Sequence, residues 1–385
     1  MNTLLVLLAS TVTLLAPEDG AVYDTCPPQV RDFLANPAKR IENPPAKDLG
    51  GFAVHNDWTM QLVQDCSRLV RKGEQPFRWS ADIPLKTVDL EFSETPDFAK
   101  VDRQAYRSTD YHQCRGMRPY YLKLGTKYYW RVRVRDPEGK DVLSETRTFT
   151  TVAEPPRMIG VPAFNRRDFG GGVNADGAKI RQGLLFRGGG VPPQLNAETG
   201  NMSAKKMTVE GVRELYINHL GIKTDLDLRG KVEPKGPDVA DVGIQCFAFA
   251  LDGYHMYLPP NLPLYREIFK VLADEKNYPI YVHCAVGCDR TGSLGILIDG
   301  VLGRDDKWCY DNYELSSMHP ELPRFRYGRK GGELFSYFDP ASPRFDHKKP
   351  KVTGKTIREN VVQYLLSIGV KQEEIDSFRR IMIED

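Results

Sequence analysis

One short segment of this sequence combines a nucleophile with a fixed cation. From Ile280 the chain reads Ile-Tyr-Val-His-Cys-Ala-Val-Gly-Cys-Asp-Arg-Thr-Gly, which places Cys284 six positions before Arg290. The apolar residues before Cys284 are typical of a buried strand, and the residues after Arg290 are typical of a helix. A loop between a strand and a helix can gather backbone amides and the helix N-terminus around one anion. The segment therefore predicts a phosphate-binding loop that begins with a cysteine nucleophile.

The residues of this loop have separate predicted uses. The residues expected to bind the phosphate are Ala285, Val286, Gly287, Cys288, Asp289 and Arg290. Gly287 permits a backbone conformation and a close approach that a side chain would obstruct. Arg290 can clamp two phosphate oxygens with its planar guanidinium, which Lys cannot imitate. The same positive field favours the thiolate form of Cys284, which would attack phosphorus and form a phosphocysteine intermediate.

Two neighbours of the loop are predicted to support it. Thr291 could hydrogen-bond the thiolate and help it leave in the second step. His283 is expected to orient the loop rather than to act as a base, because a thiolate needs none.

A lone cysteine is usually structural, but the whole string placed between a strand and a helix is far rarer.

The elements around the loop predict an α/β domain over residues 158–385. Short strands are expected at Lys223–Leu228 and Pro279–Val282, and helices at Leu264–Asp274 and Ser293–Leu302. A final helical segment at Thr356–Ile383 is broken in two by Gly369. Strands that alternate with helices imply a mainly parallel central sheet flanked by helices.

The residues before this domain predict an all-β domain over 11–152, joined to it by a stiff linker at 153–157 that contains Pro155 and Pro156. Apolar and polar residues alternate at Leu85–Phe92 and Tyr128–Val134, and a last strand is expected at Val142–Thr150. An insert at about 25–74 interrupts the pattern and contains a helical periodicity at 58–70.

Composition excludes several classes of protein. Hydrophobic residues make up 41% and charged residues 27%, as in ordinary globular proteins, and the net charge of +2 gives no bulk attraction to nucleic acid or to an anionic membrane. No apolar run reaches the length of a membrane-spanning helix. Seven cysteines are too few for a disulfide scaffold in a chain of this length, and the odd number leaves at least one free thiol.

The first ten residues are strongly apolar, but no Lys or Arg precedes them. We expect residues 1–10 to be a short signal for export to a periplasmic or extracellular space. The alternative is a cytoplasmic protein, in which the apolar start simply leads into a first strand at Thr11–Ala16.

The string His-Cys-x-x-Gly-x-x-Arg-Thr-Gly resembles the signature of the protein tyrosine phosphatase superfamily. The wider domain is similar to the bacterial tyrosine/lipid phosphatase branch, which has a Gly-x-Asp-Arg-Thr-Gly loop. Four further segments resemble that branch in the same order: Asn165–Gly171, Arg181–Arg187, Leu220–Arg229 and Asn312–Ser316. The resemblance implies a phosphatase fold and hydrolysis of phosphotyrosine, or of phosphoproteins more broadly, without a metal or another cofactor.

The N-terminal domain resembles a fibronectin type III domain. The similar segments are Leu14–Ala21, Phe77–Trp79, Leu90–Ser93, Leu124–Arg135 and Ser144–Thr150. Such a sandwich is usually an adhesive or spacing module. A protein or a glycan is therefore the expected kind of partner for this domain.

One loop position departs from the family pattern. Cys288 stands where Lys is usual, which removes a positive charge and argues against highly charged substrates such as multiply phosphorylated inositol lipids. Cys288 could form a reversible disulfide that protects Cys284 from overoxidation. The favoured alternative is a neutral filler, because the geometry of a disulfide is demanding.

The leaving oxygen of a phosphate ester needs a proton, and two carboxyl groups are candidate donors. Asp289 lies in the loop, and in the resembling branch this Asp is the favoured acid; alternatively, it forms an ion pair that orients a basic side chain. Asp252 lies some thirty residues upstream of Cys284, a separation similar to that in dual-specificity phosphatases, and Gly253 could be the hinge of a mobile loop. The alternative for Asp252 is a solvated carboxylate. We favour Asp289.

Three further residues are weaker candidates. Arg167 could contact the substrate beyond its phosphate, whereas Asp168 and Arg229 could equally form a buried structural ion pair. The structural interpretation is favoured for Asp168 and Arg229.

Several functions compete at this stage. The favoured one is a phosphomonoester hydrolase of the protein tyrosine or dual-specificity type. A phosphoinositide or inositol phosphate phosphatase is an alternative, although cysteine phytases generally carry Gly where this chain has Asp289. A rhodanese-like sulfur transferase fits less well, because His283 and the Arg-Thr-Gly end favour a phosphatase. A silent phosphate-binding module would typically lack Cys284 or Arg290.

Overall fold

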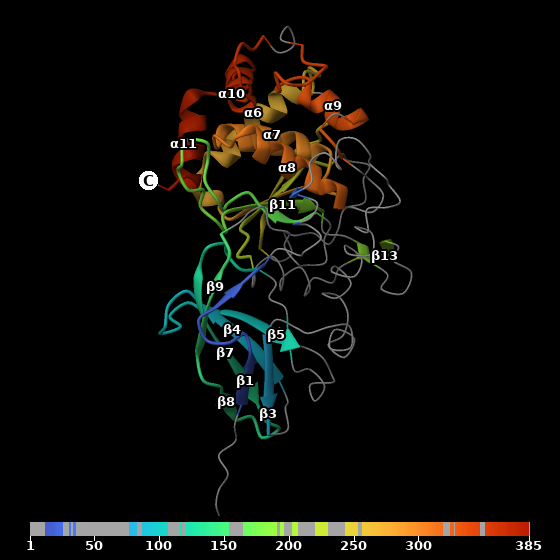
Figure 1. Cartoon of the computed structure of the whole chain (residues 1–385). Coiled ribbons are helices and arrows are strands. Elements are labelled where there is room, and N and C mark those ends of the chain that lie inside the picture. The colour runs from blue at the N-terminus through green and yellow to red at the C-terminus, as the bar shows by residue number, and fades with distance from the viewer. Residues whose placement is uncertain are drawn as a thin grey trace, which may run out of the picture. The chain divides into compact units, whose positions relative to one another are not determined.

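The chain divides into two compact units (Figure 1). The N-terminal unit comprises Met1–Thr25 and Gln61–Val152, and the C-terminal unit comprises Cys26–Met60 and Ala153–Asp385. The structure is a computed structural model that describes residues 12–25, 31, 34–35, 77–82, 87–106, 116–117, 121–153, 165–190, 193–195, 202–206, 220–229, 243–252, 256–318, 324–326, 328–346 and 351–384. The predicted signal at 1–10, the helix at 58–70 and most of the linker at 153–157 lie outside these residues.

The described strands of the N-terminal unit form two sheets. One sheet has the order β1 (Val12–Ala16), β3 (Phe77–Ala81) and β6 (Gly116–Met117). The other has the order β2 (Ala21–Tyr23), β9 (Arg147–Thr151), β7 (Lys127–Arg135), β4 (Thr87–Ser93) and β5 (Asp102–Tyr106), with β8 (Asp141–Leu143) paired to β7. Side chains of both sheets, such as Trp79 and Trp130, meet in one hydrophobic core.

The alternation predicted around Tyr128–Val134 is confirmed in β7, where buried and more exposed residues alternate along the strand. The apolar face of this strand covers the core. Each large apolar side chain that is fully buried there contributes about 1.5–3 kcal/mol to the stability of the fold. The single strand expected at Val142–Thr150 is instead two, β8 and β9. Between them, Ser144 hydrogen-bonds Val132 of β7 through both its backbone amide and its hydroxyl.

The C-terminal unit contains a five-stranded sheet with β16 (Ile280–Cys284) at its centre. The order is β10 (Arg167–Asp168), β11 (Leu185–Gly189), β16, β14 (Thr224–Asp227) and β15 (Gln245–Ala248). Three strand pairs are parallel, but β10 pairs antiparallel with β11. The sheet is therefore mixed, with the parallel majority that the sequence predicted and one antiparallel edge strand. A short separate ribbon joins β12 (Pro193–Leu195) to β13 (Met202–Lys206).

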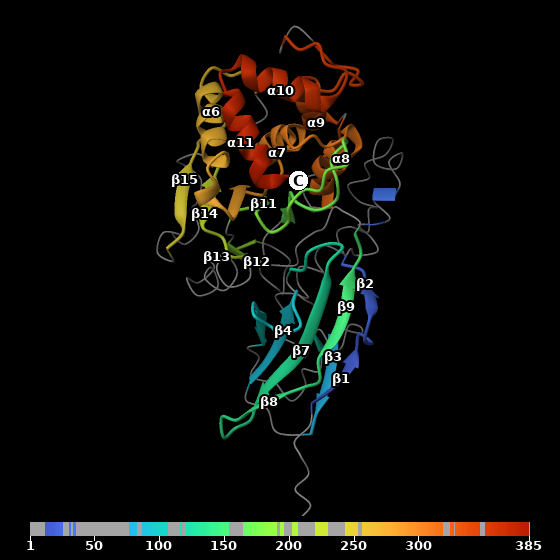
Figure 2. The same cartoon turned by 90° about the vertical axis from the view of Figure 1, so that its left-hand side faces the viewer.

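Six α-helices of the described residues pack in this unit, and both views place them together on one side of the sheet (Figures 1 and 2). They are α6 (Asn261–Leu272), α7 (Arg290–Val301), α8 (Asp306–Glu314), α9 (Arg329–Phe335), α10 (Ile357–Ser367) and α11 (Gln372–Met382). The break predicted at Gly369 is confirmed, because this glycine has φ +94° between α10 and α11. None of the described helices is long and apolar enough to cross a bilayer.

Helix α7 is the buried centre of this helical layer. Its residues from Thr291 to Val301 are all buried, and it packs against β11, β16, α8 and α10. A helix that is buried all round needs apolar residues on every face, which the run from Leu294 to Ile298 supplies. This packing fixes the start of α7, at Arg290, relative to the end of β16.

One acid lies inside that core. Asp299 of α7 is 1% exposed and accepts hydrogen bonds from Asn312 Nδ2 at 2.5 Å and from Trp308 Nε1 at 3.3 Å. Burial raises the pKa of Asp299 to about 6, and the hydrogen bond from Asn312 and the charges of Arg304 and Arg187 only partly oppose this rise.

The buried Asp299 should make the stability of the C-terminal unit depend on pH. Because its folded pKa lies above its unfolded value of about 4, the folded state binds this proton more tightly. We expect the contribution of Asp299 to the free energy of unfolding to fall as pH rises from about 4 to about 6, by a few kcal/mol at most, and then to stay constant. Urea unfolding of the wild type and of Asp299→Asn at several pH values measures this, and identical pH profiles would contradict it.

Candidate active site

The sequence-predicted loop runs from the end of β16 to the start of α7. Cys284 is the last residue of β16 and Arg290 is the first residue of α7. The side chain of Cys284 is 1% exposed, whereas Ala285 is exposed and Arg290 is partly buried. The predicted nucleophile therefore lies at the floor of the loop. Solvent reaches Ala285 and part of Arg290, whereas Gly287 and Cys288 are buried.

The carbonyl oxygens of this loop are bound by donors from distant parts of the chain. The amide of Gly190 lies 2.6 Å from the Cys284 carbonyl and 3.2 Å from the Ala285 carbonyl. The Gly287 carbonyl accepts from Asn165 Nδ2 at 2.8 Å and from Arg187 Nη2 at 3.1 Å. A carbonyl that is held on one side of a loop leaves the neighbouring amides free to face the other side, where an anion can bind.

Gly287 is the tightest point of the loop. Its φ is +72°, and a Cβ added to it would lie 2.3 Å from the carbonyl carbon of Gly188. Strand β11 can approach the loop this closely because Gly287 lacks a side chain. Both reasons for glycine that the sequence offered, conformation and close approach, hold at this position.

Two buried arginines stand behind the loop. Arg187 of β11 donates to the Gly287 carbonyl and, at 3.4 Å, to Asn312 Oδ1. Arg167 donates through Nε to Asn312 Oδ1 at 2.9 Å, through Nη2 to the Asn312 carbonyl at 2.6 Å, and through Nη1 to Asn165 Oδ1. Burial lowers the pKa of both guanidinium groups, because it penalises their charged form.

The loop carboxylate, Asp289, forms an ion pair with Arg324. Its Oδ1 lies 2.5 Å from Arg324 Nε and its Oδ2 lies 3.0 Å from Nη2, so both oxygens accept from one guanidinium. A proton donor has to carry a proton, whereas this arrangement favours the charged carboxylate. The acid role of Asp289 stays a prediction, and the geometry favours the ion-pair alternative.

Asp252 lies apart from these contacts. Its side chain is exposed, and its backbone amide and carbonyl are held by the side chain of Asn261 at 3.0 and 3.2 Å. Gly253, the proposed hinge, lies outside the described residues. The solvated-carboxylate alternative agrees with the exposure of Asp252.

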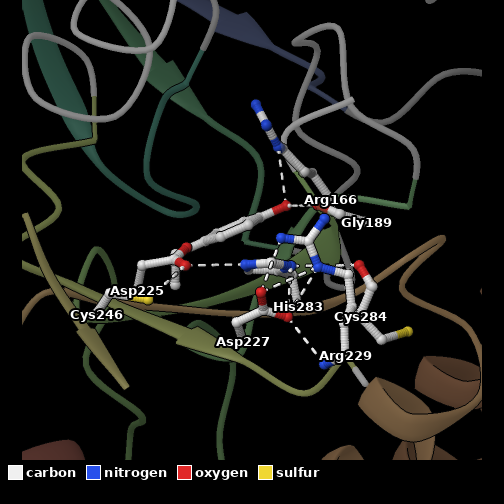
Figure 3. A network of polar contacts seen from close by, with 9 residues as sticks. Arg166, Gly189, Asp225, Asp227, Arg229, Cys246, His283 and Cys284 are labelled. Atoms are coloured by element: carbon white, nitrogen blue, oxygen red, sulfur yellow. Dashed lines mark hydrogen bonds and ion pairs between the residues drawn. The ribbon is translucent and has the colours of Figure 1, made fainter. Parts of the chain in front are cut away.

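His283 lies beside Cys284 and is held by a cluster of charged groups (Figure 3). Its Nε2 lies 2.9 Å from Asp225 Oδ2, and its Nδ1 lies 3.3 Å from the Cys284 carbonyl. Burial alone would lower the pKa of His283, but the charge and the hydrogen bond of Asp225, with a further contribution from Asp227, give a net rise. The expected orienting role of His283 has a direct contact to support it.

Cys288 and Thr291 are both buried. Burial raises the pKa of the Cys288 thiol to about 12, and the charge of Cys284 adds to the rise. The sulfur lies 3.5 Å from Asn165 Nδ2 and 3.9 Å from the Ser316 carbonyl, which agrees with a neutral filler. Thr291 Oγ1 has no hydrogen-bond partner among the described residues, so its contact with the thiolate remains a prediction.

The weaker candidates have structural partners. Asp168 accepts from the amides of Gly170 and Gly183, both at 2.7 Å. Arg229 forms its ion pair with Asp227, with Nη2 2.8 Å from Oδ2. Arg167 is fully buried and its guanidinium donates to Asn312, so its contact with a substrate stays a prediction.

Sequence reasoning missed five residues that hold the loop: Asn165, Arg187, Asp225, Asn312 and Arg324. A signal existed for two of them. Arg187 directly follows the apolar run Leu-Leu-Phe, and Asp225 lies inside the predicted strand Lys223–Leu228. A charge inside a buried strand marks a paired or functional group. Among the described residues, no group of three or more His, Cys, Asp or Glu side chains could hold a metal ion.

We expect Gly287→Ala to lower kcat/KM by about tenfold to a hundredfold, because backbone strain of about 1–3 kcal/mol and the clash with Gly188 would displace the loop. Gly177→Ala is the matched control, since Gly177 also has a positive φ, of +87°, but open space around it. Hydrolysis of p-nitrophenyl phosphate measures both variants. Equal losses in the two would show that strain alone matters and that the close approach does not.

Comparisons with known proteins point to one family. The profile of the tyrosine phosphatase family matches residues 161–384. The inositol diphosphatase DSP4 of Arabidopsis thaliana is 31% identical over 146 residues, which cover 36% of this chain and 69% of that protein. The inositol diphosphatase DSP2 of Arabidopsis thaliana is 42% identical over 60 residues, which cover 16% of this chain and only 20% of that protein.

One solved structure shows a weak likeness to this chain. The core catalytic domain of the PP-IP phosphatase SIW14 from S. cerevisiae, in complex with citrate, aligns with a TM-score of 0.28 and 16% identity, over 45% of this chain and 88% of that chain. A likeness at this TM-score is too weak to bear on the fold or the function. The family assignment depends on the sequence match over residues 161–384, which is more than half of the protein. This chain belongs to the tyrosine phosphatase family.

Proposed function

We propose that this protein hydrolyses phosphate groups by covalent catalysis at Cys284. The observation that carries the proposal is the loop itself: Cys284 ends β16, Arg290 begins α7, and buried donors hold the loop carbonyls. This arrangement supports an anion site directly above the nucleophile. Arg290, from the first turn of α7, would bind the phosphate oxygens there.

The reaction has two steps. The sulfur of Cys284 forms a bond to phosphorus while the bond from phosphorus to the leaving oxygen breaks, and the leaving group takes that electron pair. Water then attacks the phosphocysteine, the thiolate departs, and inorganic phosphate is released. The backbone amides and Arg290 would stabilise the charge on the phosphoryl oxygens in both steps.

We propose a phosphoanhydride on an inositol phosphate as the substrate, rather than phosphotyrosine. One support is the pair of relatives named inositol diphosphatases. The other is Asp289, whose two oxygens are engaged by Arg324. An alkoxide or phenoxide leaving group needs a proton, but the leaving group of a phosphoanhydride is itself a phosphate, which is stable as an anion at neutral pH. A loop whose carboxylate is held in an ion pair suits the second kind of substrate.

The residue at position 288 does not argue against a highly charged substrate, because its side chain packs away from the expected phosphate site. The sequence argument was that Cys288 removes a positive charge from the pocket. Its sulfur is 0% exposed and packs toward Asn165 and Ser316, behind the loop. Arg187, which donates to the Gly287 carbonyl, and Arg290, the first residue of α7, supply positive charge at the same loop.

For the N-terminal unit we propose a fibronectin type III sandwich that binds a protein or a glycan outside the cytoplasm. Its support is the pair of sheets around one hydrophobic core. The apolar residues 1–10 support export.

The substrate proposal is tested with the full chain in the presence of EDTA. We expect kcat/KM for a diphosphoinositol phosphate to exceed that for a phosphotyrosine peptide and for p-nitrophenyl phosphate by about tenfold or more, which is about 1.4 kcal/mol in the barrier. We expect Cys284→Ser to abolish turnover of all three while inorganic phosphate still binds. Turnover by the serine variant would end the thiolate mechanism. A preference for the phosphotyrosine peptide would restore the protein substrate predicted from the sequence.

The role of Asp289 is tested with leaving groups of different basicity. If Asp289 anchors Arg324, we expect Asp289→Asn to slow a series of aryl phosphates by a similar factor, about tenfold for one lost charge-assisted hydrogen bond. Asp176→Asn is the control, because it removes an exposed ion pair with Arg358 at 2.9 Å, away from the loop. Slowing that is confined to the poorest leaving groups would assign the acid role to Asp289 instead.

A further inference from the structure

The imidazole of His283 is enclosed between two groups that can only accept hydrogen bonds. Asp225 Oδ2 faces Nε2 at 2.9 Å, and the Cys284 carbonyl faces Nδ1 at 3.3 Å (Figure 3). The side chain of His283 is 1% exposed, so water does not substitute for these partners. Each ring nitrogen therefore needs its own proton if both contacts are to be hydrogen bonds.

A neutral imidazole carries a single N–H and can donate to one of these oxygens only. A doubly protonated ring donates to both, and the Asp225 carboxylate balances its charge. Asp227 Oδ1, 3.9 Å from Nδ1, adds a second negative charge on the same side as Cys284. Arg229 holds that carboxylate through three contacts of 2.8 to 3.0 Å, which leaves Asp225 as the principal counter-ion of the ring.

The charged and titratable groups around His283 come from each neighbouring strand. They are Asp225 and Asp227 of β14, Arg229 just after it, Cys246 of β15, and Tyr281 and Cys284 of β16 itself. Strand β11, on the other side of β16, faces this region with the glycines Gly188 and Gly189. The Cys246 thiol lies 3.9 Å from Asp225 Oδ2, a weak contact compared with that of His283.

We propose that Asp225 is a positioning residue that keeps His283 doubly protonated, and that the resulting imidazolium fixes the Cys284 carbonyl and favours the Cys284 thiolate. The proposal rests on the proposed function, because it concerns the nucleophile of that reaction. The ion pair is neutral as a whole, but it is a dipole. Its positive end contacts the Cys284 backbone, and its negative end lies beyond the far edge of the ring.

The direction of this dipole determines whether it stabilises or destabilises the Cys284 thiolate. Electrostatic interactions are stronger in a buried site than in water, so a positive charge one residue from the nucleophile stabilises an anion there. The burial of His283 and the charge of Arg229 lower the pKa of the ring, but the charge and the hydrogen bond of Asp225, together with the charge of Asp227, give a net rise. Without the carboxylate, the buried ring would lose its second proton and with it one of its two hydrogen bonds.

The first test measures the alkylation of Cys284 by iodoacetamide as a function of pH, followed by mass spectrometry so that no turnover is needed. We expect Asp225→Asn to move the pH midpoint of alkylation upward by about one unit. The matched controls are Cys246→Ala, which keeps the carboxylate but removes its other contact, and Asp176→Asn. Both should leave the midpoint where it is in the wild type.

A double-mutant cycle of Asp225 and His283 shows whether Asp225 acts on Cys284 through His283 or only by stabilising the fold in general. We expect His283→Gln to raise the midpoint by itself, and Asp225→Asn to add nothing in that background. Asp225→Glu should restore most of the wild-type midpoint. An unchanged midpoint in Asp225→Asn, or an equal shift with and without His283, would overturn the proposal.

A second measurement uses the wild-type protein, so it does not depend on a variant that folds. Nitrogen NMR of the His283 ring should show both nitrogens protonated at pH 7.5, where an exposed imidazole is mostly neutral. A single neutral tautomer at that pH would refute the imidazolium and the role of Asp225 with it. Neither measurement requires catalysis, so a failed substrate assay together with a shifted midpoint would count against the proposed function alone.

Discussion

The carbonyl oxygens of the loop that begins at Cys284 have to be bound by buried donors before the amides of that loop can face an anion. A buried carbonyl without a partner costs about 1–3 kcal/mol, so the loop cannot hold this shape by itself. The donors are the Gly190 amide, Asn165 and Arg187, and each comes from a segment about a hundred residues away in sequence. The strand order of the sheet and the close packing at Gly287 bring these three donors to the loop.

The charges around the loop are balanced differently on its two sides. On one side, His283 and Arg229 each have a carboxylate partner, in Asp225 and Asp227. On the other side, Arg187 donates to a backbone carbonyl and an amide oxygen, which are dipoles rather than anions. A guanidinium bound to neutral oxygens keeps more of its field for a bound phosphate than one paired with a carboxylate. The charge of Asp299 partly offsets the field of Arg187.

What the sequence could predict depended on how far apart the interacting residues lie. The spacing of Cys284 and Arg290, the alternation in β7 and the break at Gly369 are local patterns, and the structure shows each of them. The antiparallel edge strand β10 could not be anticipated, because two residues carry no periodicity. The pair formed by Asp289 and Arg324 spans 35 positions and crosses from the loop to a segment beyond α8. Ordinary sequence patterns carry no information about such a pairing.

The same loop residues can serve different chemistry according to what the rest of the fold places beside them. From the sequence, Asp289 was favoured as the proton donor because the resembling branch uses this loop Asp as its acid, and an ion pair was the alternative. In the structure, Arg324 engages both of its oxygens, and the carboxylate becomes part of the wall of the site. Because Arg324 is already paired, it binds an incoming phosphate less strongly than an unpaired cation would. Its charge also cancels the repulsion that the Asp289 carboxylate alone would exert on that phosphate. For a substrate with several phosphates the cancelled repulsion matters more, because every added phosphate would otherwise meet the same negative charge.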